Sequence, residues 1–256
     1  SEPSPGGVPW TLFRASPSAP PFPYDTLERR RELRRQGFSL VLETDGVLAR
    51  DGHMLGLDLI RSPGSRARTL LRQHGSRSRT IYLTSAQLCI PALEAAARRQ
   101  TPLHLHVTAR PFSPLHLSCL RTFRAPLFVQ ISAPVTAQTW RAIASIPHLQ
   151  GLVIERGRCP SAALRALSAH PGLQVLHLRR CHLRSQDLPP LKRLRHLREL
   201  DLSHNPGIHN RNIHTLAQLP HLQVLRLHGT GINAGALAAI ARLDHLEELD
   251  IGRTGI

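Results

Sequence analysis

Pairs of aliphatic residues separated by one residue recur along this chain at an almost constant interval of 23 to 25 residues. The pairs are Leu57/Leu59, Ile81/Leu83, Leu105/Val107, Val129/Ile131, Leu152/Ile154, Leu176/Leu178, Leu200/Leu202, Leu225/Leu227 and Leu249/Ile251. Because successive side chains of a strand point to opposite faces, both members of a pair point the same way. Each pair therefore predicts a short strand, and the constant interval predicts about nine stacked structural repeats.

The residues after each pair predict a turn and a helical return. A polar or small segment follows the strand, and apolar residues then lie three apart, as at Leu237, Ile240 and Leu243. Prolines such as Pro147 and Pro220 stand where a return segment has to end. One such unit cannot bury its own leucines, but stacked units share one continuous core.

The full pattern, L-x-x-L-x-L followed by a turn and a return, resembles the leucine-rich-repeat family over about residues 52–256. The resemblance implies an α/β solenoid, with a curved parallel sheet on the concave face and short helices on the convex face. In that family the ninth position of a unit is often Asn, whose side chain satisfies turn backbone groups. Here it is Asn205 in one unit, Cys181 in another, and Thr230 and Thr254 in two more.

The segments before the repeats differ in composition. Residues 1–24 hold seven prolines and predict a disordered Pro/Ser-rich leader. Its aromatic residues could form a docking motif or pack onto the solenoid end. Residues 25–51 predict an N-terminal helix and strand cap. The repeat domain, residues 52–256, stops before a return helix, and we expect it to be truncated at its C-terminus.

The formal net charge is +16, and the chain has 16 His in addition. Such a charge is informative about the partners of a protein rather than about its fold. It favours an acidic protein, nucleic acid or an anionic membrane surface, or it reflects a composition that fills solvated faces with Arg. The four cysteines form no C-x-x-C pair, and we interpret Cys159 and Cys181 as small buried residues of the turns. No phosphate-binding loop, H-E-x-x-H or G-x-S-x-G motif is present, so we expect no enzyme in this segment, no cofactor and no metal. No apolar run is long enough to span a membrane.

Two groups of side chains at the strands form the candidate partner-binding site. The middle residues of the last pairs should lie side by side on neighbouring strands: His177, Asp201, Arg226 and Asp250. They either pair with one another and keep the face soluble, or they contact a partner. A basic band follows just past the strands, with Glu155 as its exception: Arg156, Arg179, Arg180, His204, His228 and Arg253. We expect most of this band to lack a partner within the chain and to bind an acidic protein, while the absence of interleaved aromatics makes nucleic acid unlikely.

One unit contains the run Gly235-Ala236-Leu237-Ala238, and with the 24-residue period it resembles the repeats of GALA-type effectors. Bacterial plant pathogens secrete such effectors through the type III system into the host cell. The resemblance implies a secreted virulence effector that binds a host protein, although the F-box of those effectors is absent from this sequence. Another effector group places a leucine-rich-repeat domain before a ubiquitin ligase domain. The alternative function is therefore substrate recognition for a ligase domain beyond this sequence, and the alternative location is the bacterial cytoplasm.

Overall fold

The computed structural model describes residues 120–132 and 135–256, Leu117, and five strand segments before them. The chain divides into two compact units, Ser1–Ser39 and Leu40–Ile256. The predicted leader, residues 1–24, and the predicted helix at its C-terminal side lie outside the described residues. Of the predicted cap, residues 25–51, only two strands are described.

Eleven strands form one sheet, in which the spatial order follows the chain order. They are β1 (Ser39–Val41), β2 (Val47–Arg50), β3 (His53–Asp58), β4 (Thr80–Leu83), β5 (Leu103–Val107), β6 (Leu127–Ile131), β7 (Leu149–Ile154), β8 (Val175–Leu178), β9 (Glu199–Asp201), β10 (Val224–Arg226) and β11 (Glu248–Asp250). Strands β2 and β3 are antiparallel, and every neighbouring pair from β3 to β11 is parallel. Parallel neighbours joined by return segments are what a repeated strand-and-return unit produces.

The pairing register places the aliphatic pairs of successive repeats opposite one another. Leu176, for example, lies between Leu152 and Leu200, and Leu225 lies between Leu200 and Leu249. The first four of these five leucines are fully buried, and only Leu249 in the last strand is 38% exposed. The predicted solenoid of parallel strands and short helices is confirmed.

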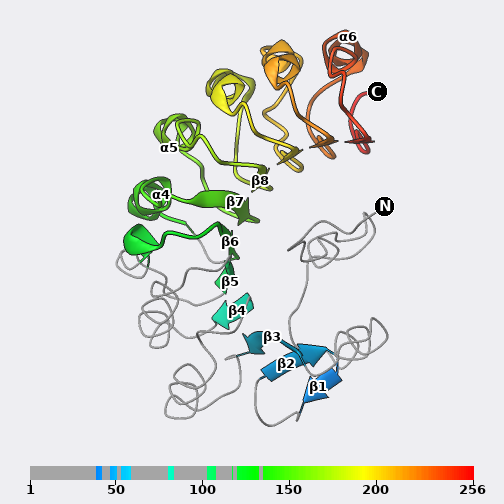
Figure 1. Cartoon of the computed structure of the whole chain (residues 1–256). Coiled ribbons are helices and arrows are strands. Elements are labelled where there is room, and N and C mark those ends of the chain that lie inside the picture. Colours follow the sequence, from blue (N-terminus) through cyan, green and yellow to red (C-terminus); the bar gives the residue numbers. More distant parts are fainter. Residues whose placement is uncertain are drawn as a thin grey trace. The chain divides into compact units, whose positions relative to one another are not determined.

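The return segments are α4 (Ala137–Ala144), α5 (Ser161–Leu167), η3 (Ser185–Asp187), η4 (Pro189–Arg193), η5 (Ile213–Gln218), η6 (Ala234–Ala236) and α6 (Leu237–Ile240). Figure 1 shows the labelled helices α4, α5 and α6 on the same side of the strands. Thr136 caps the N-terminus of α4, and its hydroxyl accepts a hydrogen bond from the Thr139 amide at 3.2 Å. η4 is a 3₁₀ turn, and Pro189 and Pro190 occupy its first turn, where a helix lacks amide partners anyway.

The core lies between the strands and the returns. The largest fully buried side chain is Trp140 of α4, whose indole N–H donates to the Arg158 carbonyl oxygen at 3.0 Å. Within the described residues, apolar side chains of successive repeats join one continuous cluster that runs from Leu105 to Leu243. Within the described part of the chain, no helix is both long and apolar enough to cross a membrane.

Candidate partner-binding face

The strand face, which we define as the side of the sheet away from the returns, carries two columns of side chains. One column consists of the middle residues of the aliphatic pairs, and the register places Val153, His177, Asp201, Arg226 and Asp250 on consecutive strands. The other column consists of the residues just before each pair, because positions two apart on a strand share a face.

The second column contains two acids that the sequence interpretation missed, Glu199 on β9 and Glu248 on β11. Period-two alternation was the signal that could have found them, since each stands two residues before a middle residue already chosen. Both matter for the electrostatics, because each lies next to a basic side chain of the preceding repeat.

Among the described residues, two ion pairs and two histidine–carboxylate contacts join neighbouring repeats on the strand face. They are His177 Nε2–Glu199 Oε2 at 3.6 Å, Arg179 Nε–Asp201 Oδ2 at 3.6 Å, Arg226 Nη2–Glu248 Oε1 at 2.6 Å and His228 Nδ1–Asp250 Oδ1 at 3.4 Å. In each of them the basic residue belongs to one repeat and the acid to the next. The middle residues therefore do not pair with one another, and that alternative of the sequence interpretation is wrong.

The middle residues do not form a fully exposed polar row, because two of them are buried. His177 is only 8% exposed and Asp201 only 4%. Asp201 Oδ1 accepts a hydrogen bond from the Ser203 amide at 2.9 Å, and Asp250 Oδ1 accepts one from the Gly252 amide at the same distance. These two carboxylates thus hold the turn that follows the strand, so their first role is structural.

The basic band is only partly free of partners. Arg179 forms an ion pair with Asp201, and His228 Nδ1 lies 3.4 Å from Asp250 Oδ1, so two of the six residues of the band have an acidic neighbour. They do so because the middle-column acids lie one repeat further on, next to the basic residue that follows the preceding strand. Within the described residues, the remaining arginines of the band form no ion pair and are exposed: Arg156, Arg180 and Arg253.

The second residue after each of the last four aliphatic pairs has a left-handed backbone. The φ angles are 53° at Arg180, 58° at His204, 64° at Gly229 and 52° at Arg253. A residue with a Cβ pays about 1 kcal/mol for this conformation, whereas glycine does not. Gly229 shows that the position accepts glycine. Three of the four repeats nevertheless keep a basic side chain there.

His204 lies in the middle of this basic column. Its imidazole stands edge-to-face on His228, with ring centroids 5.2 Å apart. Burial and the neighbouring positive charges, Arg180, His228 and Arg179 in that order, lower the pKa of His204, and Asp201 opposes them only partly. A Cβ on Gly229 would come within 3.0 Å of His204 Nδ1, so glycine leaves room for this ring.

Asn205 ties together the turns beneath the basic column. Its Oδ1 accepts hydrogen bonds from the Cys181 and Leu183 amides at 2.9 and 3.0 Å. Its Nδ2 donates to the Leu178 and Leu202 carbonyl oxygens at 2.8 and 2.7 Å. The predicted role of Asn205 in satisfying turn backbone groups is confirmed.

Among the described residues, threonine at the same position of other repeats makes no hydrogen bond to the preceding repeat. Thr230 Oγ1 donates to the Leu227 carbonyl oxygen at 2.7 Å, and Thr254 Oγ1 donates to the Ile251 carbonyl oxygen at 2.7 Å. Each hydroxyl thus reproduces only the bond that Asn205 makes within its own turn.

The two described cysteines, Cys159 and Cys181, are free and buried, which confirms their interpretation as small residues of the turns. Burial raises the pKa of the Cys181 thiol to about 12 and raises that of Cys159 further. Neither thiol is therefore prepared for nucleophilic or metal chemistry. Among the described residues, no group of three or more His, Cys, Asp or Glu side chains could hold a metal ion.

Packing accounts for the small residues in the Gly235-Ala236 run. A Cβ on Gly235 would come within 2.7 Å of Asn210 Nδ2, and Ala236 is completely buried. The run spans η6 and the start of α6, where one return segment lies against the preceding one. The small side chain of Ala236 thus fits the stacking of the returns, and Gly235 leaves room for the Asn210 side chain.

Comparison with known proteins gives one family match. Residues 171–232 match the leucine rich repeat family model. No curated protein matches this chain.

Solved structures with similar chains include an internalin (inlF) from Listeria monocytogenes, at 14% identity and a TM-score of 0.49, covering 78% of this chain and 61% of that chain. A second is the Arabidopsis receptor kinase HAESA in complex with the peptide hormone IDA and the co-receptor SERK1, at 14% identity and a TM-score of 0.44, covering 89% and 46%. A third is a TLR13–ssRNA13 complex, at 14% identity and a TM-score of 0.40, covering 73% and 34%. This chain thus matches less than two thirds of each of these longer proteins.

Proposed function

Because this chain is a leucine-rich-repeat protein, we propose that it is a binding module that recognises a protein partner through its strand face. Stacked repeats present extended surfaces that are suited to macromolecular partners. The observation that carries the proposal is the left-handed column, where Arg180, His204 and Arg253 stand at a position that Gly229 occupies without strain. Strained residues persist where the structure or a function requires their side chains.

The partner's contact surface is acidic. Arg156, Arg180 and Arg253 are exposed and form no ion pair within the described residues. An arginine that reaches solvent with its guanidinium unpaired binds a carboxylate in two parallel hydrogen bonds. The paired residues around these arginines, including Arg226 and Asp250, form the rim and hold the backbone that presents them.

The test is a pair of charge-reversal variants that change the net charge equally. One variant reverses the unpaired strand-face arginines (R156E, R180E and R253E), and the other reverses three arginines of the return segments (R141E, R165E and R193E). Arg179 is left in place, because a carboxylate there would face Asp201 and disturb the turn.

Captured proteins are quantified from host-cell lysate, and circular dichroism verifies that both variants fold. The proposal predicts that the first variant loses the partners that the wild type and the second variant retain. Equal retention by all three proteins contradicts the strand-face site.

We further propose that the module acts as a bacterial effector, delivered by type III secretion into a host cell where it binds a host protein. The GALA-like run from Gly235 to Ala238 supports this proposal. A translocation assay with a reporter fused to the complete protein tests it: the reporter enters host cells from a secretion-competent strain and fails to enter from a secretion-deficient one. Reporter that stays in the bacterial cytoplasm of both strains contradicts delivery.

A further inference from the structure

The return side of the repeats carries positive charge that nothing within the described residues neutralises. Both ion pairs and both histidine–carboxylate contacts of the described residues lie on the strand face. The exposed cations of the first described returns and of the turns leading into them form a set that we name the return-side cations: Arg141, Arg158, Arg165, Arg184, Lys192 and Arg193.

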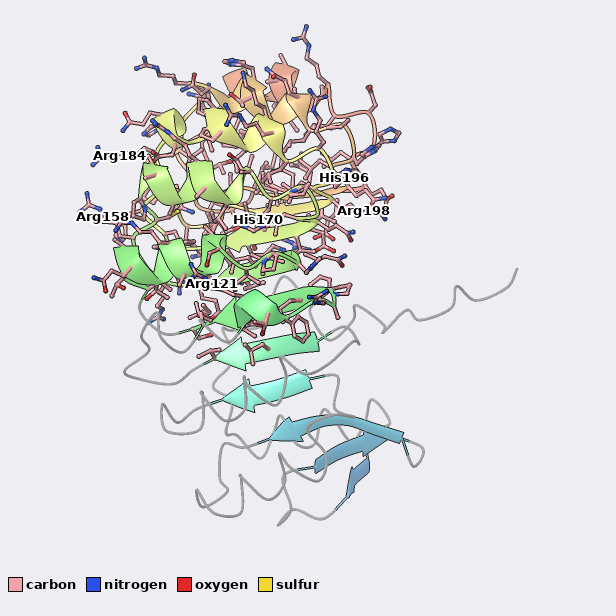
Figure 2. The ribbon with its side chains drawn as sticks, turned by 60° about the vertical axis from the view of Figure 1, so that its left-hand side comes forward. Arg121, Arg158, His170, Arg184, His196 and Arg198 are labelled. Carbon is pink, nitrogen blue, oxygen red and sulfur yellow. The ribbon has the colours of Figure 1, made fainter. Side chains whose placement is uncertain are left out.

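Packing places the return segments that carry these cations next to one another. α4 lies against α5, and α5 lies against η4, so their last turns follow one another from repeat to repeat. Each last turn holds a cation: Arg141 in α4, Arg165 in α5, and Lys192 with Arg193 in η4. In Figure 2, Arg158 and Arg184 extend from one side of the ribbon, one repeat above the other. Figure 2 shows Arg198 and His196 on the opposite side.

Acids are few on the same surface. Four acids occur in the described return segments and the turns beside them: Glu155, Asp187, Asp244 and Glu247. Glu155 is half-buried, and its carboxylate accepts a hydrogen bond from the Ser132 hydroxyl at 3.5 Å. Asp187 is buried, and its carboxylate accepts hydrogen bonds from the Ser161 hydroxyl at 2.5 Å and the Arg184 amide at 2.9 Å. Asp244 and Glu247 follow α6, beyond the return-side cations.

The charge is concentrated in the earlier of the described repeats. Residues 117–198 contain thirteen Lys and Arg and two acids, whereas residues 199–256 contain four Lys and Arg and six acids. The return-side cations thus belong to a strongly positive block, and the repeats after it are nearly neutral.

The exposed side chains between the return-side cations are small or polar. Those of α4 and α5 besides arginine are Ala137, Gln138, Ser161, Ala162 and Ala166. Neither an aromatic ring for base stacking nor a large apolar side chain for insertion into lipid is exposed on these two helices. Such a surface binds by charge alone.

We propose that the return-side cations bind the phosphate backbone of duplex nucleic acid. Arginine matches phosphate oxygens with two parallel donors, and backbone binding needs no stacking residues. A row of cations that continues over successive returns suits a linear polyanion, whereas stable attachment to a membrane usually needs an apolar insertion or a lipid anchor as well. The expectation that nucleic acid is unlikely concerned stacked bases at the strand face, and a backbone site on the return side is independent of it.

The test measures binding of the 256-residue chain to a fluorescein-labelled 24-base-pair DNA duplex by anisotropy between 50 and 200 mM NaCl. Each lost phosphate contact lowers the slope of log Kd against log salt by about 0.9. The return-side variant (R141E, R165E, R193E) should bind at least about tenfold more weakly at 50 mM, with a slope lower by roughly 2 to 3. The strand-face variant (R156E, R180E, R253E), which has the same net charge, should stay within about threefold of wild type.

Three results would overturn the proposal. The first is an equal loss of affinity in both variants, which would make the effect one of net charge. The second is binding to phosphatidylserine vesicles without binding to the duplex. The third is full affinity for the duplex in the neutral variant R141Q, R165Q, R193Q together with a lower melting temperature. That result would mean that these arginines only stabilise the C-terminal ends of the helices through the helix dipole.

Discussion

Replacing Asn205 by Ala is expected to destabilise the repeats by about 3–4 kcal/mol. The side chain is completely buried and makes four hydrogen bonds of 2.7 to 3.0 Å to two turns. The substitution leaves the Cys181 and Leu183 amides buried without an acceptor. A buried donor without a partner costs about 1–3 kcal/mol, so two amides give about 2–6 kcal/mol, and the expected loss lies near the middle of that range.

Thr230 supplies the matched control. Its hydroxyl makes one hydrogen bond, to the Leu227 carbonyl oxygen, so Thr230→Ala should cost only about 1 kcal/mol. Asn205→Thr should fall between the two, because threonine can reproduce the bond within its own turn but not the bonds to the preceding repeat. Urea unfolding followed by circular dichroism gives the three free energies of unfolding.

Hydrogen exchange gives a second and more local readout. The amides of Cys181 and Leu183 should lose protection in Asn205→Ala and keep it in Thr230→Ala. If Asn205→Ala costs no more than Thr230→Ala, or if these two amides remain protected, then the side chain does not hold the turns as described.

Three further predictions concern the core, the left-handed column and pH. Leu200→Asp buries an unpaired carboxylate at a side chain with no exposed surface, so urea unfolding should show a loss of more than about 4 kcal/mol; an unchanged midpoint would contradict the inward assignment. Arg180→Gly and Arg253→Gly relieve a left-handed backbone and should each raise the free energy of unfolding by about 0.5–1 kcal/mol, while weakening partner capture; a loss of stability would contradict the strain argument. His204 has a lowered pKa, so below the ordinary value of 6.5 the unfolded chain takes up a proton that the folded chain resists, and stability falls as pH decreases. His204→Asn, which tolerates the left-handed backbone, should lose less melting temperature than wild type between pH 7.5 and 5.5; identical losses would show that His204 does not contribute.

The strand register could be predicted from the sequence because it depends on a single repeated feature. Two aliphatic residues separated by one residue must share a face, and the constant interval carries that face from repeat to repeat. The pairing of Leu176 with Leu152 and Leu200 follows directly. Asn205 could be interpreted for a similar reason, since a buried amide at the turn can satisfy both donors and acceptors.

The electrostatics of the site could be predicted only in part, because they depend on where neighbouring repeats place their charges. Glu199 and Glu248 belong to the strand face but stand outside the aliphatic pairs, and they determine the partners of His177 and Arg226. The residue type at position 180 does not reveal its left-handed backbone, because arginine is not a residue that favours positive φ. Glycine at position 229 was the one sequence signal for that turn.

Site-specific photo-crosslinking tests the central claim, that the strand face and its left-handed column bind the protein partner, most directly. A photoreactive amino acid is placed at position 180 in one protein and at position 165, on the return side, in another. Both are irradiated in host-cell lysate. We expect a discrete protein adduct from position 180 that is absent from position 165 and disappears when R156E and R253E are added. An adduct of equal yield from both positions, or from position 165 alone, would contradict it.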